Sequence, residues 1–325
     1  MRRRSRGLIA TAGIVLASVL TAVAVAYQTA GWYGVNVMAR RGVSTWDEVS
    51  PTDERLTPGM RLALAGSPTP DVVSSVIWRE VRPGLEVAEV PVRVAGRPVD
   101  TLLVTRVDPH RYRFRVMSRP AGDRDLDQWM SATGATVVIN GSYFARRGAP
   151  DTPVVSDGRL LGPATYQATH GAFVVDAAGA RLEDLAGRDW RPLLATAEQA
   201  MVSYPLLLGA DGQGRVGTAD PRWLANRSFL GQDRAGRILV VSTTDAYFSL
   251  TALSAFLPRS GLDLRLALNL DGGPVSCHAV AAGDYRRRHC GNYETAVHDG
   301  RLELLRSLVA LRTYPMPVAL VVTPA

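Results

Sequence analysis

The stretch ALNLDGGPVS, residues 267–276, carries one carboxylate from the end of an apolar run into two glycines and a proline. Glycine lets a backbone turn sharply and approach a ligand closely, and proline fixes the conformation of the chain that leaves the turn. Asp271 therefore either caps a tight turn or lies in an active site. Both alternatives place the acid at the end of a buried strand.

The segments around this stretch predict further strands. In RYRFRVM, residues 111–117, arginines alternate with Tyr112, Phe114 and Val116, which is the period of a half-buried strand. Helical patterns occur at 125–134 and 249–261. Apolar runs that predict interior strands occupy residues 135–140, 171–176, 236–243, 264–270 and 317–322. We therefore expect an α+β fold, a strand-rich single catalytic domain with few helices.

The N-terminus has the pattern of an export signal. MRRRSR precedes an apolar run at residues 7–26, and Ala24, Val25 and Ala26 form the small-x-small pattern of a cleavage site. The run is also long enough to span a bilayer, with the basic head on the inside. We expect a signal peptide or signal anchor at 1–26, a spacer at 27–71 and the domain at 72–325. Either alternative makes the domain extracytoplasmic, and a membrane is a partner only if the segment is uncleaved.

The two cysteines agree with export. Cys277 and Cys290 flank residues 278–289, which predict two short strands around a turn at 282–284. Facing positions of a hairpin can be bridged by a disulfide. The alternative is a zinc site built from Cys277–His278 and His289–Cys290, but neighbours on one strand point to opposite faces. We favour the disulfide over zinc or free thiols.

Charge and composition exclude several functions. The net charge of +7 comes from arginines that are spread along the chain, with few aromatic residues between them, so we expect no nucleic-acid partner. GQGRVG, residues 212–217, matches a dinucleotide fingerprint, but Asp220–Pro221 prevents the helix that should follow. The histidines show no ligand spacing. We therefore expect no cofactor and no catalytic transition metal.

Three segments share one design, an apolar strand that runs into a polar end with a glycine. They are VVINGSYF (137–144), ANRSFLG (225–231) and ALNLDGG (267–273). The candidate catalytic groups that they offer are Asn140, Arg227 and Asp271, and the candidate substrate-binding residues are Gly141, Ser228, Gly272 and Gly273.

Two further candidates lie outside these segments. His170, in THGAFVV, is either a proton donor or a structural histidine, and Asp245, in STTDAYF, is either a second carboxylate or part of the N-cap region of the next helix.

The order of these motifs, with PVVSDG at residues 153–158, resembles the phosphodiester glycosidase family over about residues 72–322. The chain departs from many members at Pro274 and Val275, where they have glycine and serine. The resemblance implies hydrolysis of a sugar-1-phosphodiester at the anomeric carbon. Asp271 would then act as base or nucleophile, since the phosphate monoester is already a good leaving group.

The resemblance also implies roles for the neighbouring residues. Arg227 and the amides of Gly272 and Gly273 would bind the phosphate, and Asn140 would orient a sugar hydroxyl or the phosphate. We expect an extracytoplasmic hydrolase that cleaves the glycosidic C–O bond of a sugar-phosphate in an envelope or secreted glycan. The alternatives are a catalytically silent carbohydrate-binding or polysaccharide-assembly protein on the same scaffold, and a metal-assisted phosphodiesterase with clustered Asp and His ligands.

Overall fold

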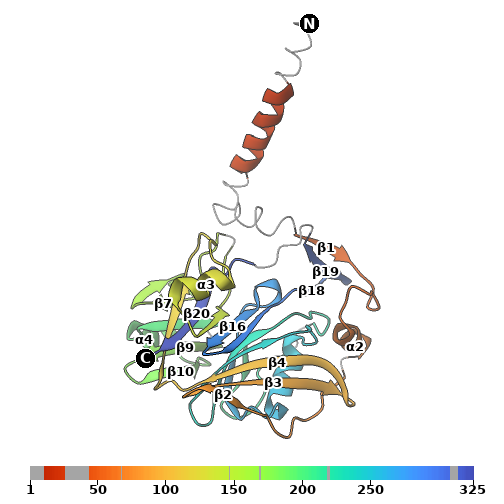
Figure 1. The fold of residues 1–325 in the computed structure, drawn as a ribbon. Helices are drawn as coiled ribbons and strands as arrows, with labels where there is room; N and C mark the ends of the chain where they lie inside the picture. Colours follow the sequence, from red (N-terminus) through yellow and green to blue (C-terminus); the bar gives the residue numbers. More distant parts are fainter. Residues whose placement is uncertain are drawn as a thin grey trace, which may run out of the picture.

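The part of the chain that the structure describes is built mainly from antiparallel strands, which form four sheets (Figure 1). The computed structural model describes residues 11–25, 44–66, 68–145, 147–167, 170–217, 220–307 and 314–325. Within these ranges, α-helix is confined to residues 11–25, α2 (Pro58–Gly66), α3 (Leu126–Thr133), α4 (Trp190–Ala195) and α5 (Leu250–Phe256). The predicted strand-rich α+β class is confirmed.

A seven-stranded sheet forms the centre of the fold. Its order is β12 (Leu206–Leu208), β15 (Leu264–Asn269), β13 (Ser228–Asp233), β14 (Ile238–Thr243), β4 (Arg97–Val107), β3 (Leu85–Val94) and β2 (Arg79–Arg82). Alternate side chains of β14 enter different cores: Leu239 and Val241 join one apolar cluster, and Ile238 and Val240 join another. Because both faces of this strand are covered, its sequence is apolar without alternation.

Three smaller sheets complete the fold. One is β17 (Tyr285–Cys290), β16 (Cys277–Ala282), β6 (Val137–Asn140), β20 (Val318–Pro324) and β5 (Tyr112–Ser118). The second is β10 (Gly179–Asp184), β9 (Gly171–Asp176), β11 (Gln199–Ser203), β7 (Val154–Ser156) and β8 (Arg159–Leu161). The third is β1 (Ser44–Glu48), β19 (Arg301–Ser307) and β18 (Thr295–His298).

Local sequence signals explain the predicted elements. In β5 the residues that alternate with arginine are buried. The helix α3 begins behind a capping box in which Asp125 accepts from the backbone N–H of Gln128, and it ends at Gly134 in the left-handed conformation, with φ of 61°. Ser249 caps α5, and Pro258 and Gly261 follow its last turn. Both predicted helices are confirmed.

The described part of the predicted spacer is packed against the domain, which corrects our expectation for residues 27–71. Strand β1 pairs with β19, and α2 buries Met60 in the same apolar cluster as Leu239 and Val241 of β14. Leu56 is also only 2% exposed there. Residues 44–66 therefore belong to the folded unit, because they cover apolar surface on the central sheet.

The apolar N-terminal run is described only in part. Residues 11–25 form a helix whose side chains are exposed, and the other residues of the run lie outside the described ranges. Over the parts of the chain that the structure describes, no helix combines the length and the hydropathy needed to cross a membrane. Whether the segment is a signal peptide or an anchor stays a prediction.

Candidate functional site

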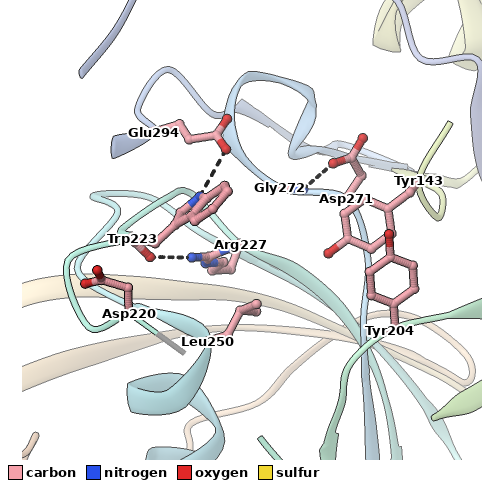
Figure 2. Close-up of a pocket in the computed structure, with 9 residues that line it drawn as sticks. All are labelled: Tyr143, Tyr204, Asp220, Trp223, Arg227, Leu250, Asp271, Gly272 and Glu294. Carbon is pink, nitrogen blue, oxygen red and sulfur yellow. Dashed lines mark hydrogen bonds between the residues drawn. The ribbon is translucent and has the colours of Figure 1, made fainter. Parts of the chain in front are cut away.

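The three segments singled out in the sequence meet at one end of the central sheet. The side chain of Asn140, at the end of β6, bonds to Ser228 at the start of β13 and to the backbone of Asp271 after β15. Beside them lies a cavity of about 310 Å³ (Figure 2). Its lining residues are Tyr143, Tyr204, Asp220, Trp223, Arg227, Leu250, Asp271, Gly272 and Glu294.

Asp271 enters this cavity from a turn that is fixed at several points. Its backbone N–H donates to Gly141 O at 3.1 Å, and its carbonyl oxygen accepts from Asn140 Nδ2 at 2.8 Å. Its carboxylate oxygen Oδ1 accepts from Gly272 N at 2.9 Å. The strand end therefore delivers the carboxylate in a defined orientation.

Asn140 and Ser228 lie behind the cavity and do not line it. Asn140 Oδ1 accepts from Ser228 Oγ at 2.8 Å and from Cys277 N at 3.2 Å, and Ser228 Oγ also bonds to Ser276 Oγ at 2.6 Å. Both Asn140 and Ser228 are buried. Their polar groups hold the Asp271 turn in place. The sequence analysis instead expected both Asn140 and Ser228 to contact the substrate.

Gly141 is explained by packing. A Cβ atom at this position would come within 2.4 Å of Val318 Cγ1 on the neighbouring strand β20. The close approach of the two strands therefore requires glycine here, and no role in binding is needed to account for it.

Arg227 provides a buried cation at the cavity wall. Its side chain is 5% exposed, and its Nε and Nη2 donate to the backbone oxygens of Phe248 and Trp223 at 3.2 and 2.7 Å. Burial lowers the pKa of the guanidinium, while the negative charges of Glu294 and Asp271 and the phenol of Tyr143 act in the opposite direction. Because the pKa of arginine is so high, the group remains charged.

Besides Asp271, the carboxylates of Asp220 and Glu294 line this cavity, and the sequence analysis missed both. Asp220 is paired with Arg222, whereas Glu294 is buried near Arg227. Glu294 lies just before β18, and its Oε1 accepts from Trp223 Nε1 at 3.3 Å (Figure 2). Burial raises its pKa, against the effects of Arg227 and of the Trp223 hydrogen bond. The segment NYET around it has no motif of its own, so only its position after the cysteine hairpin could have drawn attention to it.

The two glycines after Asp271 make room for the other groups of the site. A Cβ atom on Gly272 would come within 3.0 Å of Asn226 O, and one on Gly273 within 2.2 Å of Glu294 Oε2. The N–H of Gly272 donates to Asp271 Oδ1 and that of Gly273 donates to Asn226 O. Both predicted phosphate donors are therefore engaged within the protein.

Aromatic side chains form much of the remaining wall. Tyr143 and Tyr204 stack with ring centroids 4.4 Å apart, and Asn269 Nδ2 donates to Tyr143 Oη at 2.8 Å. Burial and the charge of Asp271 raise the pKa of Tyr143 well above its usual range. Trp223, which is 45% exposed, lies beside Glu294, and the tyrosine pair lies beside Asp271 (Figure 2).

The two remaining candidates do not line this cavity. The ring centroid of His170 lies 6.2 Å from that of Tyr204, and burial lowers the pKa of His170. Asp245 lines a different cavity of about 200 Å³ together with Asp100. Asp245 precedes α5, whose N-cap is Ser249. The structure therefore brings together Arg227, Asp271 and Gly272 and separates Asp245 from them.

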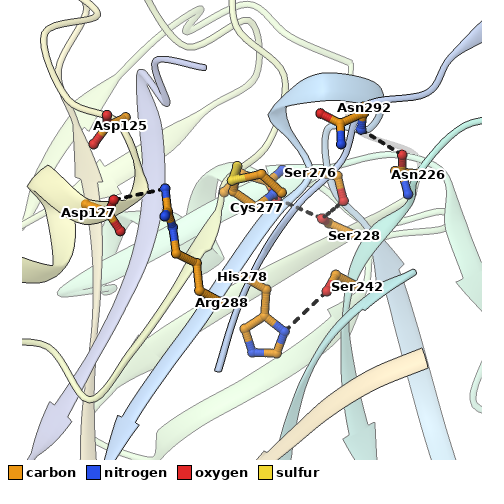
Figure 3. Close-up of a disulfide and its surroundings, with 12 residues drawn as sticks. Asp125, Asp127, Asn226, Ser228, Ser242, Ser276, Cys277, His278, Arg288 and Asn292 are labelled. Carbon is orange, nitrogen blue, oxygen red and sulfur yellow. Dashed lines mark hydrogen bonds and ion pairs between the residues drawn. A yellow bond between two sulfur atoms is a disulfide. The ribbon is translucent and has the colours of Figure 1, made fainter. Parts of the chain in front are cut away.

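The predicted hairpin and disulfide are confirmed. Cys277 and Cys290 face each other on β16 and β17 and are joined by a disulfide (Figure 3). His278 is buried in the adjacent position, with Nε2 3.1 Å from Thr105 Oγ1. Over the described ranges, no group of three or more His, Cys, Asp or Glu is arranged to hold a metal ion. The expectation of no catalytic metal stays a prediction.

Comparison with known proteins gives the family. A family model described as phosphodiester glycosidase matches residues 133–302. No curated protein sequence matches the chain.

The chain is similar to several solved structures, including the following three. The catalytic domain of zebrafish N-acetylglucosamine-1-phosphodiester alpha-N-acetylglucosaminidase, auto-inhibited by its pro-peptide, is 17% identical with a TM-score of 0.51, over 79% of this chain and 89% of that one. A hypothetical protein from Synechocystis is 15% identical with a TM-score of 0.49, over 78% and 64%. A putative exported protein from Burkholderia pseudomallei is 14% identical with a TM-score of 0.43, over 70% and 75%. Because the family match spans more than half of the residues, the chain belongs to the phosphodiester glycosidase family.

Proposed function

We propose that the protein is an extracytoplasmic hydrolase that cleaves the glycosidic C–O bond of a sugar-1-phosphodiester in an envelope or secreted glycan. The observation that carries this proposal is that the carboxylates of Asp271 and Glu294 line one cavity with the buried guanidinium of Arg227. The third carboxylate of the cavity wall, Asp220, forms an ion pair with Arg222. Two carboxyl groups are the usual catalytic pair of glycoside hydrolysis. A fixed cation beside them suits a substrate whose leaving group is a phosphate.

Arg227 and Trp223 account for the two halves of such a substrate. The guanidinium is held by backbone carbonyls at Nε and Nη2, so it does not have to be ordered when the phosphate binds. The exposed indole of Trp223 offers an apolar face to the sugar ring, while its N–H remains bonded to Glu294. The phosphate then lies near the cation, and the anomeric carbon lies near the carboxylates.

The different surroundings of the two carboxyl groups support different roles for them. Burial raises the pKa of Glu294, which favours its protonated form and suits a proton donor. Asp271 acts on the anomeric carbon, either by taking a proton from the attacking water or by direct attack. The bond between that carbon and the phosphate oxygen breaks, its electron pair stays on the oxygen, and Glu294 donates its proton to the departing phosphate monoester. After direct attack, water cleaves the glycosyl ester on Asp271 and gives a proton to the deprotonated Glu294, which releases the sugar and restores both carboxyl groups.

The setting outside the cytoplasm rests on two features of the chain. The basic and apolar N-terminus has the pattern of an export signal. The Cys277–Cys290 disulfide is of a kind that persists in oxidising compartments. A sugar-phosphate glycan of the cell envelope or of secreted material is the substrate class available there.

The test is turnover of a panel of sugar-1-phosphodiesters in ¹⁸O-labelled water. The full-length wild type, Asp271→Asn and Glu294→Gln are compared, with Asp245→Asn as the control, since that carboxylate lies in the other cavity. We expect the label in the free sugar, loss of turnover in the first two variants and retained turnover in the control. Label in the phosphate would instead indicate cleavage of the P–O bond. Glycan binding without turnover would indicate a catalytically silent binding protein.

A further inference from the structure

We propose that Asn226 is a positioning residue that sets the geometry between the two carboxylate-bearing loops of the site. Asn226 is fully buried and directly precedes Arg227, and it does not line the cavity. The effect on activity rests on the proposed function, whereas the effect on the loops does not depend on it.

The loop that carries Glu294 is bound to Asn226 at three points. Asn226 Oδ1 accepts from the backbone N–H groups of Asn292 and Tyr293, both at 3.0 Å, and the first of these bonds is drawn in Figure 3. The backbone N–H of Asn226 donates to Tyr293 O at 3.1 Å. Tyr293 is the residue before Glu294, so the path of the chain into this carboxylate is fixed by Asn226.

The turn that carries Asp271 is bound to the same residue. The carbonyl oxygen of Asn226 accepts from Gly273 N at 2.8 Å, in the turn that Asp271 begins. A Cβ atom on Gly291 would lie 2.6 Å from Asn226 Cβ, so the chain after the disulfide also packs closely on this side chain. Asn226 therefore contacts both loops, and the two loops are joined to each other through it.

Asn226 is itself anchored to a rigid part of the fold. Its Nδ2 donates to the carbonyl oxygens of Thr243 and Thr244, at 3.1 and 2.9 Å, at the end of β14. Asp100 holds the chain that follows, because its buried carboxylate accepts from the N–H groups of Thr244, Asp245 and Tyr247. Both donors and both acceptor positions of the Asn226 amide are thus in use.

The test compares Asn226→Ala with Gln199→Ala. Gln199 is 1% exposed, and its amide accepts from Val116 N and donates to Asp157. It lies in β11, in a different sheet from β15 and β18, and it does not line the cavity. In Asn226→Ala we expect kcat to fall about 100-fold with a smaller change in KM, because catalytic groups that are misplaced by about 1 Å lose that much. Backbone hydrogen exchange should accelerate at residues 271–276 and 291–294. The control should show neither change.

A second variant keeps the proposal testable if the alanine protein does not fold. Asn226→Asp retains the oxygen that accepts from Asn292 and Tyr293 but turns a carboxylate oxygen toward the carbonyls of Thr243 and Thr244. We expect accelerated exchange at Thr244 and a lower kcat, with residues 292–293 still protected. Exchange at both loops of Asn226→Ala equal to that of wild type would overturn the proposal. Where only Asn226→Asp folds, unchanged exchange at Thr244 and unchanged kcat would overturn it. A loss of kcat that Gln199→Ala reproduces would also overturn it. If the wild type has no turnover, the proposed function fails while hydrogen exchange still decides the role of Asn226.

Discussion

The carboxyl group of Glu294 occupies the space in which a side chain at Gly273 would lie. A Cβ atom there would come within 2.2 Å of Glu294 Oε2, and the backbone of Gly273 has φ of +64°, a conformation that favours glycine. Two independent constraints therefore act on this position. Glycine at position 273 therefore leaves space for the carboxylate of Glu294.

Gly273→Ala should lower both activity and stability. The methyl group must displace Glu294, and the left-handed backbone adds strain, so we expect a loss of about 1–3 kcal/mol in the free energy of unfolding. Urea unfolding and kcat are measured together with those of Gly283→Ala. Gly283 has φ of +58° with no atom within 4 Å of an added Cβ, so it carries the strain without the clash. Equal turnover in the two variants would contradict the steric role of Gly273.

Trp223→Phe should move one limb of the pH–rate profile to higher pH. The N–H of Trp223 donates to Glu294 Oε1 and lowers the pKa of this carboxyl group against the effect of burial. Phenylalanine keeps an apolar ring but removes the donor, so the pKa of Glu294 rises further and its protonated form persists to higher pH. The measurement is kcat/KM against pH.

Trp190→Phe is the matched control for this substitution. Trp190 is also a donor, to Tyr166 O at 2.7 Å, but it is the first residue of α4 and does not line the cavity. Its removal should leave both limbs in place. A profile of Trp223→Phe that coincides with that of wild type would argue against Glu294 as the titrating group.

Much of the fold could be predicted because its signals are local. The alternation in β5, the cap of α3 and the facing cysteines each depend on residues within one element or one hairpin. The described part of residues 27–71 was misjudged because β1 pairs with β19, which lies far along the chain. A short segment whose strand pairing is so distant in sequence shows no periodic pattern of apolar residues from which the pairing could be predicted.

The candidate site was predictable in its place but not in its details. Apolar strands with polar ends indicated where Asn140, Arg227 and Asp271 would gather, and they do gather. The face that each side chain presents depends on strand register, which put Asn140 behind the cavity. Glu294 could not be found from the sequence, because a single acid before a short strand is common and its burial arises only from tertiary contacts.

His278 should make the protein less stable as the pH falls below about 6.5. Burial, with the nearby charges of Arg287 and His289, holds the pKa of His278 well below its usual range. The unfolded chain therefore binds a proton that the folded chain excludes. The contribution is fully present above the unfolded pKa of about 6.5 and is lost toward the folded pKa, at up to about 1.4 kcal/mol per pH unit.

The measurement is the free energy of unfolding in urea from pH 8 to pH 5 for wild type and His278→Gln. Glutamine preserves hydrogen bonding toward Thr105 and Ser242, the two neighbours of the ring, but does not titrate. His289 is present in both proteins, so the difference between their curves reports His278 together with its coupling to His289. We expect wild type to lose stability more steeply with falling pH, and parallel curves would refute the assignment.

Reduction of the Cys277–Cys290 disulfide should destabilise the protein by about 3 kcal/mol, the chain-entropy value for a loop of this size. Because Cys277 is buried, reductant is added to the unfolded protein before refolding and equilibration in urea. The double variant Cys277→Ser/Cys290→Ser should match the reduced wild type and show no response to reductant.

Loss of the same disulfide should also lower activity. The strands that the bond joins lead directly into the Asp271 turn on one side and the Glu294 loop on the other, so kcat should fall even under conditions where the reduced protein stays folded. If reduced wild type and the double variant both retain the unfolding midpoint and the kcat of the oxidised protein, the bond neither stabilises the fold nor holds the two loops.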